Sequence, residues 1–392
     1  MPTRNIRVLH VGKFYPPHIG GMETHLHDLC AELGRSCGID VEVLVANNSW
    51  HTSSQQVSGT KVTRLATPLI VASTPICLGM ISAIRRSDVD IVHLHHPNPA
   101  AFGAYAMSGH PGKLVVTYHS DILRQKYLSV VFHPVLHSAL LRASAILVTS
   151  PNYLISSSTL QRHTGRCHVV PLGISVDQFA AAPSKVAAIR ARYGSRLVLA
   201  VGRLIYYKGF DRLIRAMCGV DGRLLLIGEG PLRSQLQAES RRLGVEDRVV
   251  FLGHVDVVAP YYHAADVFVL PAVARTEAFG IVQLEAMACG KPVVNTSLDS
   301  GVPFVSQHNV TGLTVPPGDV DALAGALNCL LADQQLRSKY GSMAKLRVEQ
   351  EFTLKRMAAR TSAVYRSVLG SSAVAGDQSG VTTRESVAMP AR

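Results

Sequence analysis

The residues with the clearest chemical potential are two carboxylates, Glu277 and Glu285, in the stretch from Leu270 to Pro292. The apolar run that precedes them has the character of a strand, and helical spacing begins at Gly280. One carboxylate should therefore precede a helix, and the other should lie within it. The first N–H groups of a helix lack intrahelical partners and can bind an anion. The pattern predicts a site for a ligand with phosphate and hydroxyl groups, such as a nucleotide sugar, although two ordinary surface glutamates are the simpler interpretation.

The same stretch resembles the EX7E signature of the retaining glycosyltransferases, in particular of family four, which has the GT-B fold. The match includes both spacing and context, P-x5-E-x-F-G-x4-E-A-M-A-x-G-K-P. The resemblance implies that Glu277 contacts hydroxyls of the transferred sugar and that Glu285 binds the ribose of the nucleotide. It also implies that the backbone of Phe279 and Gly280 lies near the diphosphate.

Three further motifs fit this resemblance. Arg203 and Lys208 in VGRLIYYKGFD would be solvated surface charges in most proteins, but the family pattern G-R-x4-K-G implies that they contact the donor diphosphate. Cations fixed there would stabilise the negative charge that develops on the leaving oxygen. The resemblance also implies that Gly228, in the turn GEGP, lies near the nucleotide. His119, in VVTYHSD, is implied to hydrogen-bond a hydroxyl of the donor sugar.

The first strand-to-helix turn argues against a dinucleotide ligand. A dinucleotide site would show GxGxxG at this turn, whereas the chain has GKFYPPHIGG. A glycine pair alone often marks no more than a tight turn. In the resembling family, a glycine pair at this place lets the acceptor and the donor phosphates approach the backbone. The resemblance implies the same role for Gly20 and Gly21.

Short β-branched runs alternate with helical patterns along the chain, which is typical of parallel sheets covered by helices. The first series of predicted strands is Ile6–Val11, Val41–Ala46, Ile91–Leu94, Leu114–Thr117, Ala145–Thr149 and His168–Val170. The second series is Leu197–Val201, Leu224–Ile227, Val249–Leu252, Val267–Leu270, Val293–Asn295 and Leu313–Val315. We therefore predict an α/β protein of the GT-B type, with two Rossmann-like domains that face each other across a cleft.

The predicted domains follow from these two series. Residues 1–180 should form an N-terminal Rossmann-like domain that binds the acceptor, and residues 181–350 a C-terminal Rossmann-like domain that binds the nucleotide sugar. Residues 351–369 should form a helix that returns to the N-terminal domain. Residues 370–392 have the composition of a disordered tail. The uncharged run at 65–84 is interrupted by proline and predicts a loop and a buried helix, not a spanning helix.

Composition agrees with an enzyme that buries two cores, since the chain has 392 residues and is 47% hydrophobic. Its 7 cysteines are scattered and form no CxxC pair. Together with an N-terminus that lacks the pattern of a secretory leader, they predict a reduced, cytoplasmic protein.

Two groups of residues raise the question of a metal. Of the 17 histidines, 14 lie in the first half of the chain, and His93, His95 and His96 are the obvious ligand candidates. Their spacing is expected to send side chains to opposite faces of a strand, and GT-B transferases generally need no metal. The DxD triplets at 88–90 and 319–321 fall at the starts of elements, where capping is the simpler interpretation. We therefore predict no metal site and no cofactor.

The net charge of +12 is concentrated in the N-terminal half. Between Asp121 and Arg142, the basic residues Arg124 and Lys126 are mixed with many apolar ones. Such a segment is either a helix packed on its sheet or a surface that rests on anionic lipid. Because family members that build bacterial polysaccharides use lipid-linked acceptors, the resemblance favours peripheral contact at the inner face of the membrane. The basic residues are dispersed and aromatics reach only 6%, which argues against a nucleic-acid partner.

The resemblance implies a retaining hexosyltransferase that uses a nucleotide-diphosphate sugar and a glycan or polyprenyl-diphosphate-linked acceptor in cell-surface polysaccharide synthesis. The sequence from Glu277 onward resembles transferases of lipopolysaccharide assembly, several of which use GDP-mannose. The resemblance therefore favours GDP-mannose as the donor. UDP-glucose, UDP-galactose and other donors stay open, since many members carry Gly-Gly-x-Pro-Glu where this chain has Ser300–Phe304. A GT-B nucleotide-sugar 2-epimerase and a nucleic-acid-binding protein are the alternatives from other classes. The intact EX7E stretch argues against the epimerase.

Two carboxylates alone could also indicate a double-displacement glycosidase, in which an acid and a nucleophile flank the bond. The cations Arg203 and Lys208 argue against that mechanism. Without a well-placed carboxylate nucleophile, retention suggests attack by the acceptor hydroxyl on the same face as the departing diphosphate.

Overall fold

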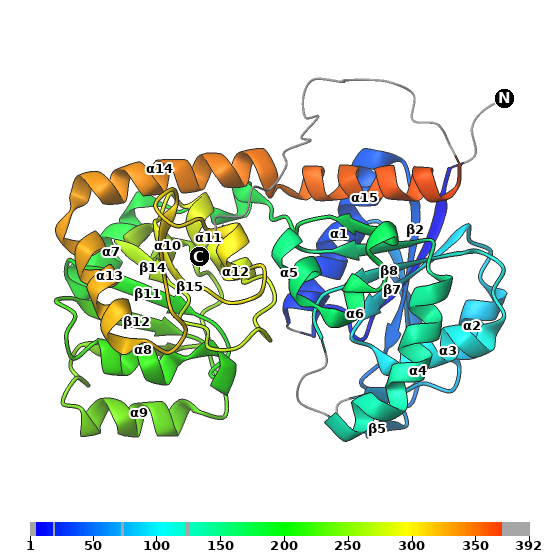
Figure 1. The fold of residues 1–392 in the computed structure, drawn as a ribbon, viewed down its shortest axis with the longest axis horizontal. Helices are drawn as coiled ribbons and strands as arrows, with labels where there is room; N and C mark the ends of the chain where they lie inside the picture. Colours follow the sequence, from blue (N-terminus) through cyan, green and yellow to red (C-terminus); the bar gives the residue numbers. More distant parts are fainter. Residues whose placement is uncertain (1–4, 19, 72–73, 122–125, 371–392) are drawn as a thin grey trace, which may run out of the picture.

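The computed structural model describes residues 5–18, 20–71, 74–121 and 126–370. These residues form two α/β domains side by side, and the chain crosses between the domains twice (Figure 1). The predicted disordered tail at 370–392 lies outside the described residues, except for Gly370.

The first domain is built on an eight-stranded sheet in the order β10-β9-β8-β7-β1-β2-β4-β3. Its strands are β1 (Arg7–Val11), β2 (Asp40–Ala46), β3 (Ser53–Val57), β4 (Thr60–Leu65), β7 (Ile91–His96), β8 (Lys113–Tyr118), β9 (Ala145–Val148) and β10 (Cys167–Val169). Neighbours are parallel, except that β3 runs antiparallel to β4. Its helices are α1 (Gly21–Cys37), α2 (Met80–Arg86), α3 (Pro99–Ser108), α4 (Lys126–Arg142), α5 (Pro151–Ser156) and α6 (Ser158–Gln161). The six predicted strands are all present.

The strands that the sequence did not predict are β3, β4, β5 and β6, which are short or polar; β4 reads TKVTRL. β3 reads SSQQV and is mostly exposed, so it shows no apolar alternation. β5 (Leu69–Val71) and β6 (Thr74–Ile76) form a separate hairpin inside the run at 65–84, where a loop was expected. That expectation is wrong because proline, here Pro75, is tolerated in an edge strand. The predicted buried helix is α2.

The second domain has a six-stranded parallel sheet in the order β13-β12-β11-β14-β15-β16. Its strands are β11 (Leu197–Val201), β12 (Arg223–Ile227), β13 (Val249–Gly253), β14 (Val267–Val269), β15 (Val293–Thr296) and β16 (Gly312–Val315). Its helices are α7 (Pro183–Tyr193), α8 (Phe210–Ala216), α9 (Arg233–Arg242), α10 (Ala259–Ala264), α11 (Ile281–Ala288), α12 (Val302–Val305), α13 (Val320–Ala332) and α14 (Gln334–Glu351). The central strands are apolar throughout because helices cover both faces. The predicted pair of Rossmann-like domains is confirmed.

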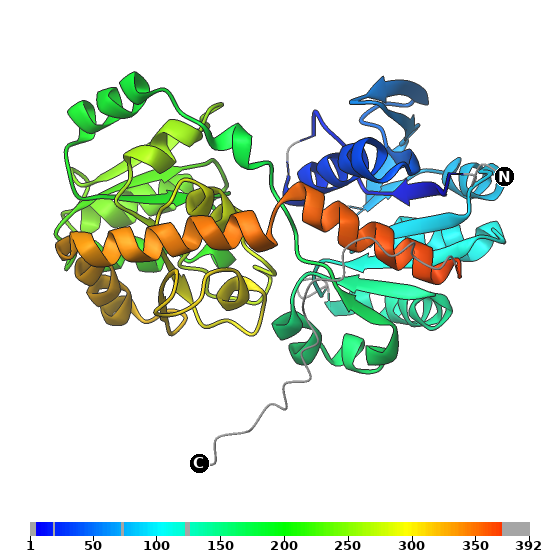
Figure 2. The ribbon, with the colours of Figure 1, turned by 90° about the horizontal axis from the view of Figure 1, so that it is seen from above.

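The last helix, α15 (Leu354–Val368), follows α14 and extends across the first domain (Figure 2). It packs against α1, and its apolar side chains belong to a core cluster of the first sheet. The members that α15 contributes are Leu354, Met357, Ala358, Val364 and Tyr365. The hydroxyl of Thr353 caps the helix by accepting a hydrogen bond of 3.3 Å from the N–H of Arg356.

The two crossings between the domains are bonded to each other. Ile174 N donates to Phe352 O at 2.8 Å, and Leu354 N donates to Ile174 O at 3.1 Å. A side chain at Gly173 would overlap the carbonyl of Thr353, so glycine permits the close approach. The connecting segments therefore form a two-stranded junction and not two independent linkers.

Candidate active site

The carboxyl ends of β11 and β12 approach each other closely at Gly202 and Gly228. Gly228 has a φ of 136°, and a side chain there would overlap the carbonyl oxygen of Gly202. Beyond this point, Leu204 N donates to Glu229 O at 2.9 Å. The predicted nucleotide turn at Gly228 therefore requires glycine for the packing of the two strand ends, and its role toward a ligand stays a prediction.

Lys208 lies just after β11, in the short 3-10 helix Tyr206–Lys208, and is 9% exposed. Its Nζ is 2.6 Å from Oε2 of the equally buried Glu277, without the alignment of a hydrogen bond. The next residue, Gly209, has a φ of 68°, and a side chain there would overlap the carbonyl of Pro271. One predicted cation and one predicted carboxylate thus form a buried ion pair at the carboxyl edge of the second sheet.

The second predicted carboxylate, Glu285, lies in α11 and accepts a hydrogen bond of 2.6 Å from the hydroxyl of Tyr262. The residue is half-buried, yet its carboxyl is desolvated, which raises its pKa to about 6. The bond from Tyr262 and the charge of Lys208 oppose this rise. Glu285 is therefore mostly ionised at neutral pH but titrates close to it.

The helix α11 follows Glu277 and contains Glu285, and its N-cap residue is Gly280, which has a φ of 74° and makes no side-chain cap hydrogen bond. A side chain at Gly280 would come within 2.7 Å of the amide nitrogen of Gln283. Gln283 is itself held by Asn295, whose Nδ2 donates to its Oε1 at 2.9 Å. Phe279 is buried in the core. This network fixes the N-terminus of α11, where free N–H groups can receive an anion. The second predicted cation, Arg203, is exposed.

In the first domain, His119 directly follows β8 and is 7% exposed. Burial lowers the pKa of its imidazole to about 4. Its Nε2 lies 3.2 Å from Nδ1 of His95. The imidazole is thus neutral near pH 7, a state in which it can hydrogen-bond a hydroxyl but carries no charge.

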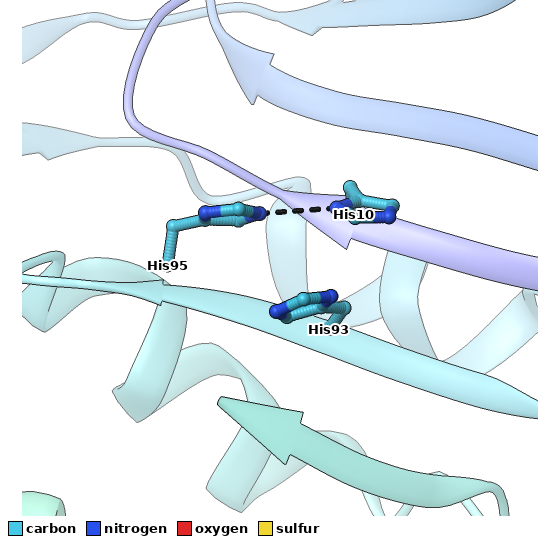
Figure 3. Close-up of side chains that lie close together, drawn as sticks. All are labelled: His10, His93 and His95. Atoms are coloured by element: carbon cyan, nitrogen blue, oxygen red, sulfur yellow. Dashed lines mark hydrogen bonds between the residues drawn. The ribbon is translucent and has the colours of Figure 1, made fainter. Parts of the chain in front are cut away.

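The β7 histidines point to opposite faces of the strand, as expected, but two of the three share one face. His93 and His95 lie on the same face because side chains alternate along a strand, and His10 of β1 joins them (Figure 3). His10 Nδ1 lies 3.0 Å from His95 Nε2. His96 points the other way and stacks on Tyr118, with ring centroids 4.4 Å apart.

Hydrogen bonds extend this histidine cluster to the last helix. The hydroxyl of Tyr365 lies 3.1 Å from His10 Nε2 and 2.5 Å from His93 Nδ1. His93 Nε2 lies 2.7 Å from the hydroxyl of Thr117. Sequence reasoning missed His10 and Tyr365. The available signal was a histidine within the apolar run RVLHV, since a polar residue on a buried strand needs a partner.

Gly20 and Gly21 lie where α1 begins. Gly20 is extended, and a side chain there would overlap the carboxylate of Glu23. Gly21 has open space around its Cα. Glu23 is buried in the first turn of α1, where the helix dipole favours a negative charge. The predicted approach of phosphates to this glycine pair therefore stays a prediction.

An ion pair links the two domains beside the predicted residues. Arg275 Nη2 lies 3.0 Å from Asp121 Oδ2. Arg275 also donates to the carbonyl of Ser156 at 3.0 Å, and its guanidinium lies over the ring of Tyr153. Asp121 accepts further hydrogen bonds from the hydroxyls of Tyr118 and Ser157, at 2.7 and 3.0 Å. Asp121 is two residues from His119, and Arg275 is two residues from Glu277. The ion pair of Arg275 and Asp121, here called the latch, therefore couples both halves of the candidate site.

The two DxD triplets have structural partners. Asp319 caps α13 by accepting a hydrogen bond of 2.9 Å from the N–H of Ala322, as predicted. Asp88 pairs with the guanidinium of Arg7, whose backbone N–H donates to Asp90 at 2.8 Å. The first triplet therefore ties β1 to the start of β7 and does not cap a helix.

The predicted basic segment falls partly outside the described residues, since Arg124 is not among them and the side chain of Lys126 is not described. Arg142 lies over the ring of Tyr105, 5.8 Å from its centroid. Within the described part of the chain, no helix combines the length and apolarity that crossing a bilayer requires.

A hollow of about 710 Å³ lies away from these residues. It is lined by α1, the β3–β4 turn and the junction residues Ser175 and Leu354, and by none of the predicted site residues. We assign it no part in the chemistry.

Two sequence families match the chain. Residues 184–347 match the family described as glycosyl transferases group 1, and residues 19–178 match glycosyltransferase family 4. The boundary between the matches coincides with the passage from β10 to α7.

The chain is similar over most of its length to proteins of known activity. It is 33% identical to the D-rhamnosyltransferase WbpZ of Pseudomonas aeruginosa, over 89% of this chain and 92% of the relative. It is 30% identical to the O-antigen chain mannosyltransferase C of Escherichia coli, over 90% of this chain and 96% of the relative. A GDP-mannose-dependent phosphatidylinositol monomannoside mannosyltransferase of Mycolicibacterium smegmatis is 31% identical over 83% of this chain and 90% of the relative.

Solved structures share the fold. A sucrose-phosphate synthase from Thermosynechococcus elongatus superposes with a TM-score of 0.79 at 24% identity, covering 94% of this chain and 100% of its own. HepE of Anabaena, in complex with UDP and glucose, reaches 0.76 at 21% identity, with 93% and 100% covered. Both domains match family models, and a relative that is 33% identical covers 89% of the chain; the chain therefore belongs to glycosyltransferase family four and has the GT-B fold.

Proposed function

We propose that the protein transfers a hexosyl group from a nucleotide-diphosphate sugar to a glycan or lipid-linked glycan, with retention of anomeric configuration. The observation that carries the proposal is the buried pair of Lys208 and Glu277 beside the open N-terminus of α11. A fixed cation and free N–H groups suit a diphosphate, and a carboxylate next to them suits sugar hydroxyls. Because Lys208, Glu277 and α11 lie in residues 181–350, we propose that this domain binds the nucleotide sugar and that residues 1–180 bind the acceptor.

Lys208 and Arg203 differ in what they can supply. Lys208 is held in place by Glu277 and is already desolvated, so its charge needs no reorganisation when the donor binds. Arg203 is exposed and can close onto the diphosphate from the solvent side. Together with the N-terminus at Gly280, they provide positive potential for a leaving group without a divalent ion.

Glu285 is the group best suited to the ribose. Its carboxylate already accepts the hydroxyl of Tyr262 and keeps oxygen lone pairs for further donors. Vicinal ribose hydroxyls are such donors, and a raised pKa makes the carboxylate a strong acceptor.

Retention by front-face attack is supported by the pairing of the nearby carboxylates. A double displacement needs a carboxylate that is free to attack the anomeric carbon. Glu277 is paired with Lys208 and Asp121 with Arg275. In the proposed reaction the acceptor hydroxyl attacks the anomeric carbon and gives its proton to the departing diphosphate. The neutral His119 holds a hydroxyl of the donor sugar.

GDP-mannose is the proposed donor because relatives over most of the chain are named as mannosyltransferases, one of them GDP-mannose-dependent. A UDP-sugar stays the alternative, since a structural neighbour was solved with UDP and glucose. Phe304 stands where many members have glutamate, and it packs on Arg347 and Phe352. Contacts from this turn to the donor sugar would therefore come from the backbone.

Peripheral membrane contact is supported by exposed apolar side chains in the first domain. The β5–β6 hairpin exposes Leu69, Ile70 and Val71, and Leu78 nearby is 79% exposed. Arg85 and Arg86 lie at the end of the adjacent α2. Apolar side chains beside arginine suit the interface of an anionic bilayer at the cytoplasmic face.

The test is a panel of nucleotide sugars incubated with the full-length protein, with and without lipid-linked acceptors. We expect donor consumption that depends on acceptor, fastest with GDP-mannose, and an α-linked product by NMR. Conversion of the donor without any acceptor would favour the 2-epimerase, and inversion at the anomeric carbon would refute the front-face mechanism. Faster turnover with a UDP-sugar would replace the proposed donor.

A further inference from the structure

A buried histidine that the proposed reaction does not use lies beside His119. His25, on α1, is 5% exposed, and neither of its ring nitrogens has a hydrogen-bond partner among the described residues. Its ring stands edge-on to those of His119 and His95, at centroid distances of 5.0 and 5.8 Å. A buried polar group without a partner is rare in folded proteins and points to a ligand that supplies the missing interaction.

The ring nitrogens of these three residues converge. One nitrogen from each of His25, His95 and His119 lies within 4.8 Å of the others, and His95 Nδ1 and His119 Nε2 are only 3.2 Å apart. Around a tetrahedral zinc ion with Zn–N bonds of about 2.0–2.1 Å, ligand nitrogens are about 3.4 Å apart. Small movements of the rings would therefore bring the three nitrogens to coordination distance.

The hydrogen-bond chain behind His95 can orient it as a ligand. If Nδ1 of His95 carries a lone pair, its Nε2–H donates to His10, and His10 Nε2–H donates to the hydroxyl of Tyr365. The Tyr365 hydroxyl then donates to His93, whose Nε2–H donates to Thr117. With this choice of tautomers, every hydrogen bond in the series has one donor and one acceptor. Metal-ligating histidines are commonly oriented by such outer-shell hydrogen bonds.

A second group of histidines, His10, His93 and His95, also has nitrogens within 4.8 Å of one another (Figure 3). Its members already use their nitrogens in bonds to one another, to Tyr365 and to Thr117. A metal there would break several hydrogen bonds, whereas a metal at His25 breaks only the contact between His95 and His119. The first group is therefore the better site.

We infer that His25, His95 and His119 form a binding site for a borderline divalent ion of the Zn²⁺ type, with His10 and Tyr365 as its supporting shell. Three neutral imidazoles suit zinc, and they leave a fourth position for water or a hydroxyl. A small hollow of about 10 Å³ lies against His95, with Glu23 and Lys13 in its wall. The site shares His119 with the proposed donor contact, although the proposed reaction itself uses no metal.

The test is a titration of chelator-treated full-length protein with Zn²⁺ against a chromophoric zinc chelator. We expect one ion per chain, and binding about a hundredfold weaker in His25→Ala. Tyr365→Phe keeps all three ligands but removes a link of the supporting chain, so it should weaken binding by about tenfold. Thermal unfolding should show a rise in Tm with Zn²⁺ in the native protein and none in His25→Ala.

The matched control is the pair formed by the exposed His133 and the half-buried His137 on α4, whose ring centroids lie 6.1 Å apart. His133→Ala/His137→Ala should bind Zn²⁺ as the native protein does. X-ray absorption of the native protein with one equivalent of Zn²⁺ needs no variant, and should show three imidazole nitrogens at about 2.0–2.1 Å. Equal affinity in the native protein and His25→Ala, loss of binding in the surface variant, or a zinc shell made mainly of oxygen would each overturn the inference.

Discussion

The carboxyl edges of the two sheets are built from opposite chemistry. In the second domain the edge carries full charges, Lys208 with Glu277 and the ionised Glu285. In the first domain it carries buried histidines whose pKa values are lowered by burial, such as His119. A charged edge suits the diphosphate and ribose of a donor, and a neutral edge suits sugar hydroxyls. The difference indicates which end of a nucleotide sugar each domain would receive.

Of the predictions that test this comparison of the two edges, removing a cation from the second domain should have the largest effect on activity. Lys208→Ala and Arg203→Ala should each lower kcat by on the order of a hundredfold or more, because the departing diphosphate would lose a positive charge that the proposed mechanism supplies. Steady-state kinetics measures the loss, and circular dichroism checks the fold. Lys185→Ala, on the exposed face of α7, is the matched control. Near-normal turnover in a folded Lys208→Ala would reject the assignment.

The two glutamates should differ in the kind of loss. Glu277→Gln should lower kcat by about ten- to a hundredfold, since its contact strengthens in the transition state, while Glu285→Gln should weaken the binding of donor and free nucleotide alike. Calorimetry with the nucleoside diphosphate separates the two. If nucleotide binding were lost in Glu277→Gln and kept in Glu285→Gln, the two roles would be reversed.

Breaking the latch between the domains should cost about tenfold in kcat/KM, because Arg275 and Asp121 hold the two edges together. Arg275→Ala and Asp121→Asn should have similar effects, and the double variant should be little worse than either, as for residues that act through one contact. Fully additive losses would mean that the two residues act separately.

A smaller, pH-dependent effect should come from Glu285. Its pKa is raised to about 6, so its carboxylate is protonated as pH falls through 6, and donor affinity should weaken severalfold below that pH. The probe should be the nucleotide sugar, because the terminal phosphate of a free nucleoside diphosphate titrates in the same range. Affinity that falls equally in Glu285→Gln would assign the effect to another group.

Chelation should have the smallest effect. Because the proposed mechanism uses cations and a helix N-terminus to stabilise the leaving group, activity should survive EDTA. The readout is initial rate before and after chelation. Complete loss that manganese restores would show that the reaction needs a metal and would move attention to the acidic triplets or the histidines.

The sequence predicted the second domain more fully than the first. Its strands are continuous apolar runs, and its EX7E stretch has fixed spacing, so the places of Glu277 and Glu285 relative to α11 could be stated in advance. The polar network of the first domain could not be predicted from the sequence, because His10, His25 and Tyr365 lie on three separate elements. Only the fold shows that Tyr365, near the end of the chain, contacts His10 near its start. The latch was missed for the same reason, since Arg275 and Asp121 lie in different domains.

The return of α15 has a consequence for how the chain folds. Tyr365, Met357 and Leu354 share a core cluster with Leu29 and Leu33 of α1 and with strands of the first sheet. The first domain is therefore discontinuous along the chain, and its α1 face stays uncovered until the last helix has been synthesised. An N-terminal fragment that stops before the second domain would expose that apolar face to water. During translation, the first domain can be completed only after the second domain and α15 have been synthesised.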